Sequence, residues 1–270
     1  MKEVAQKTSV NVIYFTTACN FACTYCYEQL NGKAVRRLTK DEIKKNIDEI
    51  LENEPEDQQT LFVMFGGEVF LEWENAKFFM DYAYNKKKNV HFNFETNGYK
   101  FRSEQFIDDF KNTLQYKAGV VSVDVSFDGL GNSQRVLRNG KQTTPFMLDI
   151  FKKLHKHNLP FRLRYTIHKE NVRVFDKDIR NIAKFIKPKR IITSIAYATL
   201  SNDDIKFIET AKTEIHNDFK RGTIDIPICE MCCETCKGCS KSKQFKSYYT
   251  KDGNINKLLI SENSPVFKDF

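Results

Sequence analysis

Residues 10–26 have the sequence VNVIYFTTACNFACTYC, in which an apolar run leads directly into three cysteines. Residues 10–16 are rich in β-branched and aromatic side chains, which is typical of a β-strand. The cysteines follow at once, as Cys19, Cys23 and Cys26. In parallel α/β folds, the loops at the carboxyl ends of the strands build the active site. The three cysteines therefore occupy a position where a functional site is expected.

Outward from this stretch, strand-like and helical patterns alternate along most of the chain. Thr39 to Asn53 is predicted as a helix, since Thr39 and Glu42 form a capping box and Leu38 and Ile43 are placed as a hydrophobic staple. Further strands are predicted at residues 60–65, 90–95, 119–127, 160–167 and 190–197, and further helices at residues 72–87, 103–114, 145–157, 172–186 and 202–220. Six consecutive β–α units predict a parallel sheet with helices outside, because parallel neighbours need crossover connections. An open sheet and a partial barrel both fit this pattern.

The composition is that of an ordinary soluble globular protein. Of the 270 residues, 41% are hydrophobic and 29% are charged. No run approaches the roughly 20 apolar residues of a membrane span, and the first residues lack the apolar core of a secretory signal, so we expect a cytoplasmic protein. The net charge of +8 is spread along the chain and indicates neither nucleic acid nor a membrane as a partner. The pattern changes near Gly222, which predicts a main domain, residues 1–221, and a cysteine-rich extension, residues 222–270.

The eight cysteines fall into two tight groups, at residues 19–26 and 229–239. Cytoplasmic thiols stay reduced, so clustered cysteines there bind metal more often than they form disulfides. Thiolates are soft ligands that suit iron–sulfur clusters. Three thiolates on a four-iron cubane leave one iron open for exogenous chemistry, so Cys19, Cys23 and Cys26 favour a catalytic cluster. A zinc site with a distant fourth ligand and buried structural thiols are the alternatives.

The spacing C-x3-C-x2-C, with Tyr25 just before the last cysteine, resembles the signature of the radical S-adenosylmethionine (radical SAM) superfamily. The resemblance covers roughly residues 10–200 and implies a partial (β/α)6 barrel. It also implies a [4Fe-4S] cluster whose open iron is chelated by the amino and carboxylate groups of S-adenosylmethionine (AdoMet). Reductive cleavage of AdoMet would then give a 5′-deoxyadenosyl radical that abstracts hydrogen from the substrate.

Two further segments at predicted strand ends resemble cofactor-binding motifs of this family. Gly66-Gly67-Glu68-Val69 is similar to the Gly-Gly-Glu-Pro motif, which binds the methionine amino group, with Val69 in place of proline. Paired glycines allow close approach of the backbone, and an acidic side chain can pair with an ammonium group. Thr96-Asn97-Gly98 is similar to the Thr-Asn-Gly that often follows the third strand in the family.

The fourth strand ends in Ser126-Phe127-Asp128-Gly129, which resembles the Ser-x-Asp-Gly motif of the subgroup that modifies peptides and proteins. There Ser126 and Asp128 would lie near the ribose of AdoMet. Residues 132–135 resemble the H-D-x-x-R segment of that subgroup, without its His and Asp. The resemblance implies that Arg135 holds the methionine carboxylate, with Arg138 as the alternative, and that Tyr25 belongs to the same pocket.

The second cysteine group contains Cys229, Cys232, Cys236 and Cys239, which form two C-x-x-C pairs, and a spare Cys233. Four thiolates suit either zinc or an iron–sulfur cluster. This tail resembles a shortened SPASM or twitch extension, the type that binds auxiliary clusters, and we expect at most one auxiliary site. Residues 248–255 are predicted to form a hairpin.

The expected function is therefore a radical SAM enzyme that modifies a peptide or protein, with an electron donor such as flavodoxin or ferredoxin. Action on a small molecule or nucleoside and activation of a glycyl-radical enzyme are the enzymatic alternatives. A non-enzymatic iron–sulfur or zinc carrier or regulator is the other class, but a carrier has no need of an AdoMet pocket. No general base or second hydrogen donor is assigned. The five histidines lack motif context and are predicted to be structural or surface residues: His91, His155, His157, His168 and His216.

Overall fold

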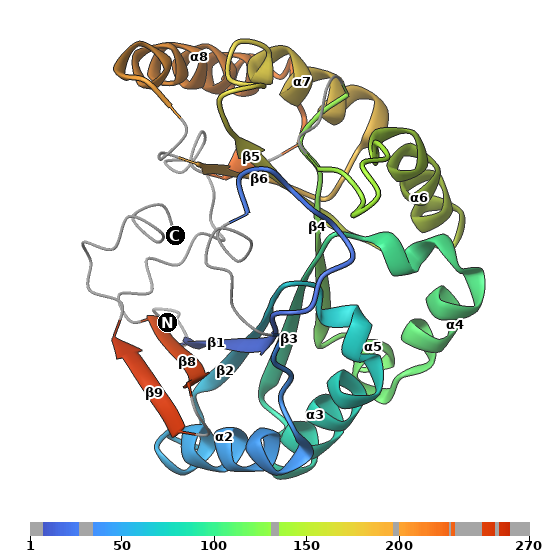
Figure 1. Ribbon diagram of the computed structural model, residues 1–270, viewed down its shortest axis with the longest axis vertical. Helices are drawn as coiled ribbons and strands as arrows, with labels where there is room; N and C mark the ends of the chain where they lie inside the picture. The colour runs from blue at the N-terminus through green and yellow to red at the C-terminus, as the bar shows by residue number, and fades with distance from the viewer. Residues whose placement is uncertain are drawn as a thin grey trace, which may run out of the picture.

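The computed structural model describes residues 8–26, 35–130, 135–196, 200–226 and 228–229, together with the backbone of residues 245–251 and 254–259. Its centre is a sheet of parallel strands: β1 (Thr8–Thr16), β2 (Gln59–Gly66), β3 (Val90–Thr96), β4 (Val121–Ser126), β5 (Arg162–Ile167) and β6 (Ile191–Ile195). Neighbours in the sequence are also neighbours in the sheet, and the sheet curls into a half-barrel (Figure 1). The partial barrel, rather than the open sheet, is therefore confirmed.

The helices lie in an arc on the convex side of the sheet, from α2 to α8 (Figure 1). They are α2 (Lys40–Glu52), α3 (Trp73–Lys86), α4 (Glu104–Asn112), α5 (Leu114–Lys117), α6 (Thr144–Lys156), α7 (Phe175–Asn181) and α8 (Asn202–Lys220). Short helical turns are η1 (Val69–Glu72), η2 (Tyr99–Arg102) and the π-helical η3 (Ile182–Ile186). The connection after each strand thus crosses the outer side, which leaves the inner side of the sheet free of the described helices.

The capping box that begins α2 is confirmed. The Thr39 hydroxyl accepts a hydrogen bond from the Glu42 backbone N–H over 3.2 Å, and the Glu42 carboxylate accepts one from the Thr39 N–H over 2.8 Å. Leu38 and Ile43 are both buried, as the hydrophobic staple requires. Such caps satisfy backbone donors that the helix itself leaves unpaired, so this helix begins where local chemistry dictates.

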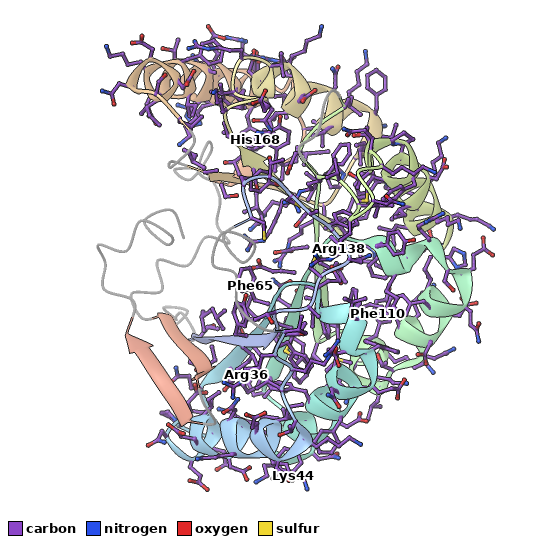
Figure 2. The ribbon with its side chains drawn as sticks, viewed as in Figure 1. Arg36, Lys44, Phe65, Phe110, Arg138 and His168 are labelled. Carbon is purple, nitrogen blue, oxygen red and sulfur yellow. The ribbon has the colours of Figure 1, made fainter. Side chains whose placement is uncertain are left out.

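The core lies between the sheet and the helices and is rich in phenylalanine. Side chains alternate along each strand, so Phe62 and Met64 of β2 are buried toward the helices whereas Phe65 is only half-buried. Figure 2 shows Phe65 on the inner side of the sheet and Phe110 among the outer elements. Burial of each such aromatic side chain contributes roughly 1.5–3 kcal/mol, which fixes the strands that carry the site.

Two predicted helices differ from the observed ones. The helix expected at residues 103–114 is divided, because the Thr113 hydroxyl accepts from the Tyr116 N–H and starts the new helix α5. The helix expected at residues 172–186 begins only at Phe175. The side chain of Asn171 accepts from the His168 N–H over 2.8 Å and donates to the Thr166 carbonyl over 2.9 Å. These bonds hold a turn after β5 and delay the helix.

Three more strands extend the same sheet at its edges. β7 (Ile228–Cys229) pairs with β6, β8 (Phe245–Lys251) pairs in parallel with β1, and β9 (Asn254–Leu259) pairs antiparallel with β8. The hairpin predicted at residues 248–255 is therefore confirmed. The division of the chain at residues 221 and 222 stays a prediction. Among the described residues, no helix is both long and apolar enough to cross a bilayer.

Candidate active site

The first cysteine group lies in the loop that follows β1. The Thr16 hydroxyl accepts from the Ala18 N–H over 3.1 Å, and the Cys26 N–H donates to the Cys23 carbonyl over 3.0 Å, so hydrogen bonds define the course of the loop. Cys23 is buried, whereas Cys19 and Cys26 are partly exposed, and all three are free thiols. Three unpaired thiols at a strand end form a donor set that suits an iron–sulfur cluster.

The surroundings of the sulfurs also suit a cluster. Cys19 Sγ accepts from the Phe21 N–H over 3.3 Å and from Asn97 Nδ2 over 3.7 Å, and Cys23 Sγ accepts from Arg135 Nη1 over 3.9 Å. Burial raises the pKa of the Cys23 thiol to about 11, although Arg135 lowers it, so metal binding would release protons from this group. Hydrogen bonds to the sulfurs are one of the means by which proteins tune such clusters.

No group of three or more His, Cys, Asp or Glu side chains within the described part of the chain is arranged to share one metal ion. A cubane does not require such a group, because each of its thiolates binds a different iron. The absence of such a group among the described residues therefore does not argue against a cluster.

The paired glycines after β2 pack against the cysteine loop. The Gly67 N–H donates to the Thr16 carbonyl over 2.7 Å, and the Glu68 N–H donates to the Ala18 carbonyl over 2.8 Å. A Cβ atom on Gly67 would lie 2.3 Å from the Ala18 carbonyl oxygen. Because these glycines have no side chain, they lie close to the backbone of the loop that carries the cysteines.

The Glu68 carboxylate joins two of the predicted motifs. It is 1% exposed, and Oε1 accepts from the Thr96 hydroxyl over 2.6 Å while Oε2 accepts from the Asn97 N–H over 2.7 Å. Burial raises the pKa of this carboxyl, and the hydrogen bonds from Thr96 and Asn97 oppose that shift. Glu68 therefore fixes the end of β3 relative to the end of β2, while its contact with AdoMet stays a prediction.

Asn97 connects the end of β3 to the cysteine loop. Its Nδ2 donates to Asn20 Oδ1 over 2.8 Å as well as to Cys19 Sγ. Its Oδ1 accepts from the Tyr99 N–H over 3.0 Å. Gly98 has φ +78°, the left-handed conformation that glycine adopts without strain, and this turn directs Asn97 toward the cysteines.

Asp128 is the centre of a second set of contacts, at the end of β4. Its fully buried carboxylate accepts from the Tyr25 hydroxyl and, over 2.8 Å, from Arg135 Nε. Neighbouring Asp128, Tyr25 and Cys23 raise the pKa of Arg135, against the lowering effect of burial. Tyr25 belongs to the cysteine loop, so these bonds bring the fourth strand and that loop together. Ser126 is half-buried at the end of the same strand.

Arg135 and Arg138 have different surroundings. The Arg135 side chain is only 13% exposed, and its guanidinium lies 5.6 Å from the centre of the Tyr25 ring. Arg138 is exposed and donates from Nε to the Cys19 carbonyl over 2.7 Å (labelled in Figure 2). Of the two arginines, Arg135 is the one enclosed with the predicted pocket residues.

His168 was not expected at the site. It follows β5 directly, is 2% exposed, and stacks on the Tyr25 ring at 4.9 Å (labelled in Figure 2). Its Nε2 lies 3.8 Å from Asp128 Oδ2 and has no hydrogen-bond partner among the described residues. Burial lowers the pKa of the imidazole, and Asp128 opposes that shift. The signal that could have found His168 is its place at a strand end, one unit after the Ser-x-Asp-Gly segment.

Several predicted residues lie outside the described part of the chain. They are residues 132–134 and the tail cysteines Cys232, Cys233, Cys236 and Cys239. For Cys229 only the backbone is described, as part of β7. The second metal site therefore stays a prediction.

Solved structures with the same fold are distant in sequence. His-tagged anSMEcpe with bound AdoMet has a TM-score of 0.70 and 15% identity, covering 97% of this chain and 79% of that one. Native anSMEcpe with bound AdoMet and the Cp18Cys peptide has a TM-score of 0.64 and 16% identity, covering 82% and 63%. SuiB from Streptococcus suis bound to S-adenosylmethionine has a TM-score of 0.57 and 11% identity, covering 90% and 58%. The chain thus spans less than two thirds of the latter two.

Sequence comparison gives the family directly. No curated protein sequence matches the chain significantly. Residues 13–186, however, match the sequence model of the Radical SAM superfamily. That match includes the cysteine loop and the ends of β2 to β5, and it spans more than half of the chain. This protein belongs to the radical SAM superfamily of enzymes.

Proposed function

We propose that this enzyme binds a [4Fe-4S] cluster through Cys19, Cys23 and Cys26, binds AdoMet beside it, and modifies a peptide or protein substrate. The observation that carries this proposal is that the cysteine thiols and the predicted AdoMet residues lie together at one end of the half-barrel. Arg135 contacts both the Cys23 sulfur and the Asp128 carboxylate, which joins the thiols to the predicted AdoMet residues. When bound, the cluster would supply the electron that cleaves AdoMet to the 5′-deoxyadenosyl radical, which abstracts hydrogen.

In this proposal, different residues around the thiols bind different groups of AdoMet. Arg135 is a buried cation suited to the methionine carboxylate, since guanidinium–carboxylate hydrogen bonds are strong and geometrically specific. Asp128 and Ser126 would accept from and donate to the ribose hydroxyls. The polar segment of Gly66, Gly67 and Glu68 would bind the methionine amino group.

The remaining pocket residues position these groups. Asn97 holds the Cys19 loop, and Tyr25 holds Asp128 from the other side. His168 closes the pocket against Tyr25, and its unpartnered Nε2 offers a hydrogen-bonding group within the described surroundings. Buried polar groups are costly unless paired, so a polar ligand such as AdoMet would satisfy this nitrogen.

A peptide substrate is supported by the Ser126-Phe127-Asp128-Gly129 segment, which resembles that of peptide-modifying members. It is also supported by the likeness of the fold to anSMEcpe, which has been solved with a bound peptide. We further propose a cytoplasmic location, an electron donor such as flavodoxin or ferredoxin, and an auxiliary iron–sulfur or zinc site. Cys229, Cys232, Cys236 and Cys239 would hold that site in a SPASM-like extension, residues 222–270.

The test is anaerobic reconstitution with iron and sulfide, followed by incubation with AdoMet and dithionite. Chromatography should detect 5′-deoxyadenosine that accumulates with time and depends on iron. A carrier or regulator binds iron but forms no such product. Reconstituted protein that holds iron and sulfide yet yields no 5′-deoxyadenosine would overturn the proposed activity.

A further inference from the structure

The inner face of the half-barrel is divided into an apolar part and a charged part. On β1 and β2 the inward positions include Tyr14 and Phe65, whose rings pack edge to face at 5.8 Å. On β3 to β5 the inward positions carry charges instead. Glu95, Asp124, Arg162 and Arg164 form one network there, which we term the inner-face network. None of these four residues is among those assigned above to the cluster or to AdoMet.

Asp124 organises the inner-face network. Its carboxylate accepts from Arg162 Nε over 2.5 Å and from Arg164 Nε over 3.2 Å, and Asn93 Nδ2 adds a bond of 3.1 Å. Arg164 Nη2 in turn lies 2.5 Å from Glu95 Oε1. Two guanidiniums are thus anchored side by side on one carboxylate, and a second carboxylate occupies one of them.

Along β3 and β4, the network lies directly before the strand ends that carry the proposed AdoMet-binding residues. Glu95 pairs in register with Asp124, and Asp124 pairs with Arg162, so three of the residues form one row across the sheet. Arg164 pairs with Ser126, one of the predicted ribose contacts. A substrate held by these arginines would therefore lie next to the residues that surround the reacting group.

Exposure increases from the base of the network to its outer members. The Asp124 side chain is 1% exposed, Arg164 is 14% exposed and Arg162 is 30% exposed. The anchoring carboxylate is thus enclosed, while the guanidiniums remain within reach of a ligand. Enclosed charges such as those of Asp124 and Glu95 cost more in desolvation than well-packed apolar side chains would, so stability alone does not account for the network.

The charge balance favours an anionic ligand. Burial raises the pKa of Glu95 to about 7, with Asp124 acting in the same direction and Arg164 and Arg162 opposing. The Glu95 carboxylate is therefore readily protonated near neutral pH, and it is then uncharged. When Glu95 is neutral, two guanidiniums face one carboxylate, and the net positive charge of the network then favours a second anion.

We propose that the inner-face network is the substrate-binding site, and that Arg162 and Arg164 bind a carboxylate of the substrate in the place that Glu95 now occupies. This inference rests on the proposed function and adds the chemical class of the substrate group. A guanidinium recognises a planar carboxylate by two parallel hydrogen bonds. The carboxylate belongs either to an acidic side chain or to the C-terminus of a peptide.

Three small probes separate these sources. N-acetylglutamic acid α-amide carries only the side-chain carboxylate, N-acetylglutamine carries only the terminal one, and N-acetylglutamine amide carries neither. Binding to the reconstituted holoprotein is measured by saturation-transfer NMR titration. At least one carboxylate probe should bind about tenfold more tightly than N-acetylglutamine amide. A roughly tenfold difference in affinity is what one charge-assisted hydrogen bond contributes. Equal binding of all three probes overturns the inference.

Variants test the residues themselves. Arg164→Gln should abolish the preference for carboxylate, whereas Arg173→Gln, an exposed arginine paired with Asp204, should leave it intact. Glu95→Gln removes the internal competitor and should tighten carboxylate binding several-fold. A purely structural network predicts weaker or unchanged binding in Glu95→Gln, and that result contradicts the proposal even if Arg164→Gln fails to fold.

The two proposals fail separately. AdoMet binding to the same holoprotein is followed by calorimetry, without any probe. Absence of AdoMet binding overturns the proposed function, whereas intact AdoMet binding with no preference for carboxylate probes overturns only the inner-face assignment.

Discussion

Arg135 donates from Nε to Oδ1 of Asp128 over 2.8 Å, and this pair joins the segment after β4 to the end of that strand. The carboxylate is fully buried, so the pair is shielded from solvent. Because Nη1 of the same guanidinium lies 3.9 Å from the Cys23 sulfur, one side chain contacts both the predicted cluster site and the predicted AdoMet site.

Arg135→Ala should weaken AdoMet binding while iron content stays near that of the wild type. Charge-assisted hydrogen bonds contribute about 1.5–3 kcal/mol, so the affinity should fall about ten- to a hundredfold. Calorimetry on anaerobic holoprotein provides the measurement. Arg138→Ala is the matched control, because Arg138 is exposed and donates its hydrogen bond to the backbone carbonyl of Cys19. Equal affinities in both variants would show that the pocket lies elsewhere.

Gly67→Ala should disrupt the cysteine loop, because the new Cβ would lie 2.3 Å from the Ala18 carbonyl oxygen. Overpacking of this kind costs about 1–3 kcal/mol and should lower both Tm and iron content. In the control Gly119→Ala, the Cβ meets no atom within 4 Å, and the cost is only the strain of φ +72°. That control should keep its iron. Identical iron content in the two variants would contradict the packing role of Gly67.

Carboxylate binding at the inner face should depend on pH. Because the pKa of Glu95 is raised to about 7, this competitor is neutral below that value and charged above it. The probes, with pKa values of about 4, remain ionised throughout. Among the described residues, the charged groups that act on Glu95 are Asp124 from β4 and Arg162 and Arg164 from β5.

Probe affinity should therefore be higher at about pH 6 than at about pH 8, and Glu95→Gln should remove the difference. Burial and Arg162 lower the pKa of His91, which lies on the same face, so His91 carries less charge over this range than an ordinary histidine. An identical pH profile in wild type and Glu95→Gln would exclude Glu95 as the titrating group.

The tail should hold a metal of its own. With Cys19, Cys23 and Cys26 all changed to Ala, reconstituted protein should retain either iron with sulfide or about one zinc per chain, as four thiolates require. Elemental analysis distinguishes the two. Protein that contains neither metal, with its tail thiols freely titratable while folded, would rule out the second site.

Local sequence chemistry predicted much of the fold. The cap at Thr39 and Glu42 and both ends of α8 (Asn202–Lys220) were predicted correctly, because they depend on residues within one or two turns. The choice of a half-barrel over an open sheet could not come from periodicity, since curvature arises from the whole sheet. It came from the family resemblance.

Motifs indicated most of the candidate site residues, whereas contacts that only tertiary packing creates were missed. His168 has no motif, and its stacking on Tyr25 exists only because β5 ends beside the cysteine loop. The internal bonds of Glu68 to Thr96 and Asn97 likewise depend on the register of β2 and β3. The late start of α7 follows from the hydrogen bonds of the Asn171 side chain. One of them reaches the Asp128 carbonyl over 3.4 Å, and no local propensity reveals that contact.

The central claim is that Cys19, Cys23 and Cys26 hold the cluster that reduces AdoMet. The most direct measurement is the rate of 5′-deoxyadenosine formation from AdoMet and dithionite in the wild type and in the three single Cys→Ala variants. Cys233→Ala, a change in the other cysteine group, serves as the control. We predict product in the wild type and the control and none in the three variants. Continued formation of 5′-deoxyadenosine in all three variants would contradict the account.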